Sequence, residues 1–170
     1  MKNLPVPYFS QYDFSVQETW RPRACTIVNL FMALLYFGKA EGTSIQELIA
    51  KGESLGGFTE HGWKHDTILE LAHAQGIPAY REEFRNKDDK EEEGRLREAG
   101  WEKIWSACSE DVLPIVSIRK ENGSYHTVLI VGSDERGLFY HDPEVGPNLF
   151  ISKEDFMSSW RGLVMFIGLE

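Results

Sequence analysis

The sequence predicts a single α+β domain, with helices first and an antiparallel sheet after them. Two patterns support this: an apolar helical run begins at Cys25, and short β-rich runs follow Leu113. No repeat or low-complexity linker divides the chain, whose 170 residues and 42% hydrophobic content suit one compact core or two small lobes that share a cleft. We expect residues 1–170 to form one domain, with a helical part over about 13–111 and a sheet part over about 112–170.

The first helix is predicted from the strongest apolar run in the chain. Residues 4–12 precede it as an extended segment, because prolines disfavour helix, and residues 13–24 form a loop. From Cys25 onward nearly every position is apolar until Gly38, which is a natural stop for a helix. A helix that is apolar on all sides is expected to lie buried on most of them.

Two shorter helices follow, and each is marked by a capping residue and a glycine. Ser44 and Glu47 have the spacing of a capping box, and Gly52 is expected to end the helix that they begin. Asp66 is expected to cap the next helix, which ends at Gly76.

A charged block, residues 82–98, comes after a short strand predicted over 77–82. The block mixes both signs and has few apolar residues, so we expect a solvated loop or an exposed helix; a lid or a partner-binding insertion is the alternative. Residues 99–111 are expected to form a further helix, because their large apolar residues are spaced along one face: Trp101, Ile104, Trp105 and Cys108.

The second half of the chain is predicted to be a sheet of short strands. An Asn-Gly pair at 122–123 has the composition of a tight hairpin turn, and residues 135–137 join the next pair of strands. Ser152 is expected to begin a short helix that ends near Trp160. The expected strands are residues 114–119, 125–131, 137–141, 148–151 and 163–169.

Charge and cysteine content exclude several classes of function. The formal net charge is −9 and there is no basic tract, so we expect neither nucleic acid nor an anionic membrane as a partner. Basic peptides would suit such an acidic surface. The longest apolar stretch, residues 27–37, is interrupted by Asn29 and is shorter than the ~20 residues of a membrane span. Two cysteines and an N-terminus without a signal-peptide pattern predict a protein of the reducing cytoplasm.

No motif points to a cofactor. The chain has no GxGxxG, no CxxC and no phosphate-binding loop, so nucleotide and structural zinc sites have no support. His61 and His65 have the spacing that binds a metal on one face of a helix, but Gly62 makes a helix there unfavourable. We expect no cofactor and no metal, and the oligomeric state is left open.

Cys25 is the candidate nucleophile. A thiol reacts as its thiolate, and the unpaired N–H groups at a helix N-terminus favour that anion. A nearby imidazolium would favour it further. The alternative is a small buried hydrophobic residue at the head of a core helix.

His126 and Asp142 are the candidate partners of that thiol. His126 begins a run typical of a central strand, and Asp142 ends the following strand, which Pro143 stops. If the two strands pair as a hairpin centred near residue 134, His126 and Asp142 emerge at the same end and can meet. The alternatives are a hydrogen-bonded histidine at a strand edge and an aspartate that binds its own turn.

Gln11 completes the candidate set. Its side-chain amide could donate to an oxyanion, as acyl-transfer sites require. The alternative is a solvated glutamine in the entry segment.

These pieces resemble the papain-like cysteine peptidases of the bacteriocin-processing type, which cleave after a double glycine in a leader peptide and are often fused to an ABC transporter. The resemblance rests on V-P-Y-F-S-Q, R-A-C, G-W before a helix, Y-H-T-V-L-I-V-G and H-D-P, and it spans about residues 5–145. It implies a papain-like fold with Cys25 as nucleophile and His126 as general base. It further implies that Asp142 orients His126 and that Gln11 supplies the oxyanion hole.

The chain departs from the family pattern directly after the nucleophile. Family members usually have Gly-Pro there, whereas this chain has Thr26 and Ile27. Threonine can still occupy the first helical turn, so the pattern is compatible with a nucleophile at Cys25.

The residues and the resemblance together predict a papain-like cysteine hydrolase, most simply a peptidase that cleaves peptide bonds through a Cys-His-Asp triad. One alternative is a catalytically inactive papain-like module that binds peptides or a partner. Another is an acyltransferase that uses the same triad. In each case the expected partner is a peptide or a protein.

Overall fold

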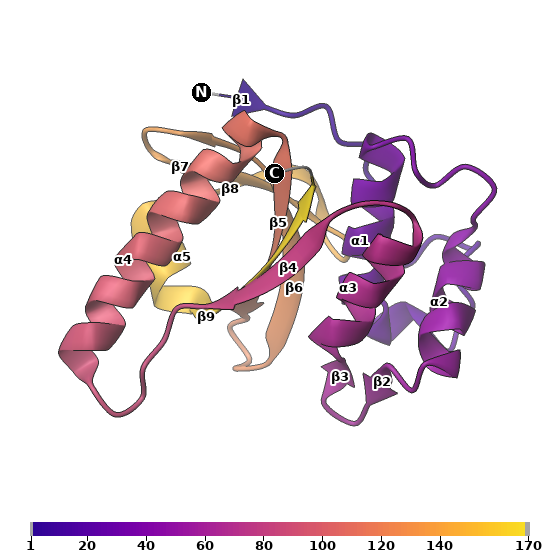
Figure 1. Cartoon of the computed structure of the whole chain (residues 1–170), viewed down its shortest axis with the longest axis horizontal. Coiled ribbons are helices and arrows are strands. Elements are labelled where there is room, and N and C mark those ends of the chain that lie inside the picture. Colours follow the sequence, from indigo (N-terminus) through magenta and orange to yellow (C-terminus); the bar gives the residue numbers. More distant parts are fainter. Residues whose placement is uncertain (1, 169–170) are drawn as a thin grey trace.

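An antiparallel sheet of seven strands forms the middle of the molecule, with helices on both sides of it (Figure 1). The computed structural model describes residues 2–168. It confirms the α+β class predicted from the sequence. Six strands lie in the order β4, β9, β5, β6, β7, β8, and the short strand β1 pairs with β6. Their bounds are β1 Lys2–Asn3, β4 Ala79–Glu83, β5 Val112–Arg119, β6 Tyr125–Asp134, β7 Gly137–Asp142, β8 Gly146–Ser152 and β9 Trp160–Gly168.

The helices divide into two groups on opposite sides of the sheet (Figure 1). Helices α1, α2 and α3 pack on one another and form a helical lobe, in which α1 contacts β5 and β6. Helices α4 and α5 lie on the other side. The bounds are α1 Cys25–Tyr36, α2 Ile45–Ser54, α3 His65–Ala74, α4 Lys90–Ala107 and α5 Lys153–Ser159; two 3-10 turns, η1 Arg21–Arg23 and η2 Cys108–Glu110, and the small hairpin of β2 Phe58–Thr59 and β3 Gly62–Trp63 complete the fold.

The expected division near residue 111 does not separate the two lobes in space. Strand β4 comes early in the chain, yet it pairs with β9 from Ala79 opposite Ile167 to Glu83 opposite Leu163 and so forms one edge of the sheet. Helix α4 covers the sheet on the side away from α1 (Figure 1). The helical lobe therefore consists of α1–α3 alone.

Helix α1 is the buried element that carries the candidate nucleophile. It begins at Cys25, as predicted, and the next nine residues, 26–34, are all buried. Gly38 adopts a φ of 64°, the left-handed conformation that ends a helix at little cost for glycine. The N-terminal end of α1 is directed toward strand β6, so the fold brings Cys25 to the junction between the lobe and the sheet.

Helix α2 begins as predicted but ends later. Ser44 and Glu47 form the capping box, with Glu47 Oε2 accepting from the Ser44 backbone N–H at 2.8 Å. The helix continues through Gly52 to Ser54. Gly52 has a packing role instead of a terminating one, because a Cβ at this position would meet a ring carbon of Trp63 at 2.6 Å. Close approach of an aromatic ring, and not a helix stop, explains the glycine.

Helix α3 also differs at its start from the prediction. It begins at His65 with Lys64 in the capping position, and Asp66 lies in the first turn. An acidic side chain there still complements the helix dipole. The remaining strands, and the helix that Ser152 caps, form where the sequence predicts them; residue 169 of the last predicted strand lies outside the described residues.

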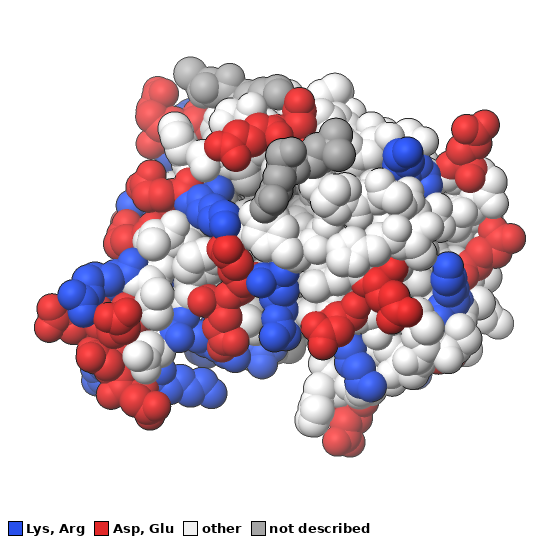
Figure 2. All heavy atoms as spheres, viewed as in Figure 1, with Lys and Arg blue, Asp and Glu red and all other residues white. Residues whose placement is uncertain are grey.

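The charged block, residues 82–98, divides between three parts of the fold. Residues 82–83 end β4, residues 84–89 form a loop, and residues 90–98 begin helix α4. Asp89 caps α4 by accepting from the backbone N–H groups of Glu91 and Glu92. Figure 2 shows acidic and basic side chains mixed over this end of the molecule. Trp101, Ile104 and Cys108 of the predicted apolar face are buried, whereas Trp105 is half-buried. None of the helices within residues 2–168 has the length and apolarity needed to cross a membrane.

Candidate active site

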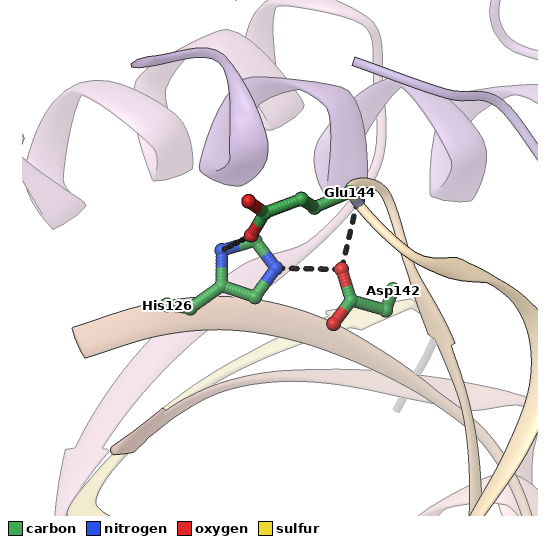
Figure 3. A group of neighbouring side chains, drawn as sticks. All are labelled: His126, Asp142 and Glu144. Atoms are coloured by element: carbon green, nitrogen blue, oxygen red, sulfur yellow. Dashed lines mark hydrogen bonds and ion pairs between the residues drawn. The ribbon is translucent and has the colours of Figure 1, made fainter. Parts of the chain in front are cut away.

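The hairpin of β6 and β7 brings His126 and Asp142 together, although not in the expected register. Leu129 pairs with His141, and the ladder shifts by one residue between Ile130 and Gly132, so Asp142 reaches His126 diagonally and not from directly opposite. His126 Nε2 and Asp142 Oδ1 are 2.6 Å apart, and both side chains are more than nine-tenths buried (Figure 3). The bulge supplies the shift that permits this contact.

Asp142 is held in place by its own turn as well as by the imidazole. Its Oδ1 accepts from the backbone N–H of Glu144 at 2.8 Å and from that of Val145 at 3.3 Å. Burial raises the pKa of Asp142, but the hydrogen bond and charge of His126 and these backbone donors outweigh it and hold the pKa below its usual range. Asp142 is therefore ionised at neutral pH, and it fixes the orientation of the ring through Nε2.

Cys25 completes this contact from the other lobe. The thiol is half-buried at the first position of α1 and forms no disulfide. Since Nε2 is engaged by Asp142, Nδ1 is the ring nitrogen available to the thiol. Burial raises the pKa of Cys25, but the hydrogen bond and charge of His126, together with Thr127, lower it to about 7. Burial lowers the pKa of His126, but Asp142 and Cys25 raise it to about 9.

Between these two values the thiolate and the imidazolium coexist. Such an ion pair is the form in which a cysteine attacks a carbonyl without a separate deprotonation step.

Gln11 lies beside the segment that leads into Cys25. Its side chain is 2% exposed, and its Nε2 donates to the backbone carbonyl of Arg21 at 2.9 Å. Its backbone N–H donates to Pro143, next to Asp142. One Nε2 proton is used by Arg21, and the buried Oε1 has no hydrogen-bond partner among residues 2–168. Gln11 is not among the residues that line the cleft beside Cys25.

Comparisons with known proteins place this geometry in a familiar fold. No family model and no curated protein sequence matches the chain. Solved structures do. One is a double-glycine-motif protease from a transporter, determined in complex with a leader peptide; it is 17% identical, with a TM-score of 0.66 over 98% of this chain and 94% of that one. Another is a C39-like peptidase from Bacillus anthracis, 14% identical, with a TM-score of 0.65 over 100% and 99% of the two chains.

The peptidase domain of Streptococcus ComA, a bifunctional ABC transporter, is 19% identical, with a TM-score of 0.61 over 88% of this chain and 93% of that one. The chain has the papain-like fold of the double-glycine peptidases. At these identities the likeness concerns the fold, and the chemistry of the site depends on this chain's own residues.

Thr26, at the departure from the family sequence pattern, joins the two lobes of the papain-like fold. Its hydroxyl lies 3.0 Å from the hydroxyl of Thr127 on β6. Asn29, one turn further along α1, donates to the Thr127 carbonyl at 2.8 Å. These buried contacts pin the first turn of α1 to the strand that carries His126. The polar Asn29 within an apolar run was the signal in the sequence for this contact.

The sequence reasoning missed Glu144, whose carboxylate approaches His126 Nδ1, the same ring nitrogen that the thiol uses. Glu144 Oε2 lies 3.8 Å from His126 Nδ1 (Figure 3). The same carboxylate forms an ion pair with Lys120. Among the described residues, His126, Asp142 and Glu144 are also the cluster whose ligand atoms lie close enough, within 4.8 Å, to bind a metal. Each already has a protein partner, and these contacts suit a hydrogen-bonded set better than a metal centre.

A cleft of about 320 Å³ opens beside Cys25 between the two lobes. The β2–β3 hairpin forms one wall with Phe58 and Trp63, and Tyr125 and Thr127 of β6 belong to the opposite wall. Trp63 Nε1 donates to the Arg23 carbonyl at 3.0 Å, which ties the hairpin to the segment before the nucleophile. His61 and His65 line the same cleft, with the hairpin and not a helix between them. The thiol is therefore open to a ligand that enters between the lobes.

Proposed function

We propose that this protein is a cysteine peptidase with Cys25 as its nucleophile. The observation that carries the proposal is the position of His126, between a half-buried thiol at a helix N-terminus and the buried carboxylate of Asp142. This arrangement favours the thiolate at neutral pH, because His126 lowers the pKa of Cys25 to about 7 and the pKa of His126 itself is raised to about 9. The cleft beside the thiol provides room for a peptide chain.

In the proposed reaction the Cys25 thiolate attacks the carbonyl carbon of the scissile peptide bond. The negative charge that develops on the carbonyl oxygen is bound by N–H donors, for which the second Nε2 proton of Gln11 and the backbone N–H of Cys25 are the candidates. The imidazolium of His126 then gives its Nδ1 proton to the leaving amine, which breaks the C–N bond and leaves an acyl-enzyme.

Hydrolysis of the acyl-enzyme uses the same groups in reverse. Neutral His126 accepts a proton from water as the water oxygen attacks the thioester carbonyl. The C–S bond breaks, the peptide acid leaves, and the thiolate–imidazolium pair is restored. Asp142 keeps the ring in one orientation throughout and stabilises its charged form, because it accepts from Nε2 at 2.6 Å.

The first substrates to test are peptides that contain a Gly-Gly pair. This choice follows from the similar protease that was solved with a leader peptide bound. Wild-type protein and the Cys25→Ser variant are incubated with a mixture of such peptides, and mass spectrometry identifies the products. We expect cleavage by the wild type and none by the variant.

The products of that experiment also separate the alternative functions. New peptides that carry an added amine instead of a free carboxylate identify acyl transfer. Equal binding of peptides by both proteins, without products, would refute the peptidase proposal and favour an inactive binding module. A Cys108→Ser variant serves as the matched control, since Cys108 is fully buried and is not among the residues that line the cleft.

A further inference from the structure

The cleft beside Cys25 carries a charge opposite to that of the chain. The protein has a net charge of −9, yet arginines gather on both walls of this cleft. Arg23 and Arg161 line it directly. Neither has a carboxylate within ion-pair distance among the described residues, and both are exposed. The net charge of the whole chain therefore differs in sign from the charge of the arginines that line the cleft beside Cys25.

On the sheet side, two arginines pack around one aromatic ring. Tyr125 is 45% exposed and lines the cleft. The Arg161 guanidinium lies 4.7 Å from the centre of its ring, and Arg119 lies 5.7 Å from it and donates to its hydroxyl at 3.3 Å. An arginine that packs against a ring keeps the N–H groups at its edge available for a planar carboxylate. Arg161 thus presents a preorganised donor to the cleft.

On the opposite wall, Arg23 lies over the ring of Phe58 at 5.9 Å. His65 also lines the cleft. Burial lowers its pKa and the charges of Arg81 and Arg161 lower it further, whereas the charge of Asp66 opposes them.

The acidic groups near the cleft do not cancel this charge. Glu60 lines it, but its carboxylate is 3.4 Å from His61 and turned to solvent with that side chain. Glu83 forms an ion pair with Arg85. Asp66 lies in the first turn of α3 and is exposed. Arg81 and Arg119, like the two lining arginines, have no such partner among residues 2–168.

We propose that the cleft selects peptide substrates with acidic side chains next to the scissile bond, and that Arg161 and Arg23 bind them. This inference rests on the proposed peptidase function and names its substrate class. It replaces the basic peptides that the overall charge of the sequence favours. The source of the carboxylate is a Glu or Asp side chain, and not the free C-terminus of a peptide.

Binding to the Cys25→Ser variant tests the inference without turnover. The probes are fluorescein-labelled, C-terminally amidated peptides that share a Gly-Gly pair and differ only in flanking residues, which are Glu, Gln or Lys. We expect the Glu peptide to bind about fivefold more tightly than the Gln peptide, as suits exposed charge pairs, and the Lys peptide to bind most weakly. Added salt should reduce the difference. Equal affinities, or binding of none of the peptides, would overturn the inference.

A charge reversal then assigns the effect to the cleft. Arg161→Glu in the same background should reverse the order, so that the Lys peptide binds more tightly than the Glu peptide. A gain of affinity cannot come from misfolding. Lys39→Glu is the matched control, because Lys39 is an exposed cation past the far end of α1, and its reversal should leave the order unchanged. An unchanged order in the Arg161 variant would contradict the assignment.

Turnover separates this inference from the function on which it rests. Cleavage of all three peptides by the wild type at equal kcat/KM would refute the charge selection and leave the peptidase proposal standing. Charge-selective binding without any cleavage would refute the peptidase proposal and leave an acidic-peptide binding cleft.

Discussion

Replacement of His126 by alanine should raise the pKa of Cys25 from about 7 to 9.0 or above. The imidazole provides the main contacts that favour the thiolate, while burial opposes it. A change of two pKa units corresponds to about 2.7 kcal/mol of thiolate stability, at ~1.36 kcal/mol per unit. At pH 7 the thiolate fraction should therefore fall from about one half to about one hundredth.

The titration is measured directly from the ultraviolet absorbance of the thiolate as the pH is raised, with the Cys25→Ser variant as the blank. Direct titration is preferable to alkylation rates, because a thiol of higher pKa is intrinsically more nucleophilic and would mask part of the effect. His61→Ala is the matched control, since His61 lines the same cleft but belongs to the exposed hairpin turn. If the midpoint in the His126 variant stays near 7, the ion pair does not exist and the mechanism fails.

Three further predictions concern the triad and its support. Asp142→Asn removes the contact that raises the pKa of the imidazole, so the alkaline limb of the pH profile of kcat/KM, expected near 9 in the wild type, should move to lower pH. Asn29→Ala leaves the buried Thr127 carbonyl without this donor, and urea unfolding should show a loss of about 1–3 kcal/mol. Gly52→Ala drives a Cβ to within 2.6 Å of Trp63, which should cost about 1–3 kcal/mol in the same assay; wild-type stability in either variant would contradict these packing assignments.

Short-range patterns in the sequence were sufficient for most elements of the fold. The start of α1 at Cys25 and the capping box at Ser44 depend on contacts within a single helical turn, and both form as predicted. The tight turns between β5, β6 and β7 depend on a few adjacent residues. The resemblance in the Cys, His and Asp segments led to the papain-like fold that the solved structures share.

Errors in the prediction arose where distant segments meet. The sequence predicted Gly52 as a helix stop. In the structure its side is covered by Trp63, which comes from a hairpin further along the chain. The sequence placed β4 in the helical part of the chain, whereas in the structure β4 pairs with β9 and belongs to the sheet. A bulge near Val131 sets the β6–β7 register, and no local pattern in the sequence marks it.

The sequence by itself determined which residue types are present in the order that a thiol hydrolase requires, because that order is a one-dimensional property of the chain. The tertiary structure alone decided that His126 contacts Asp142 across a shifted register and that Thr26 and Asn29 join α1 to β6. It also decided the sign of the charge at the cleft. Net charge is an average over the whole surface, whereas a ligand beside Cys25 meets Arg23 and Arg161, which come together only when the two lobes pack.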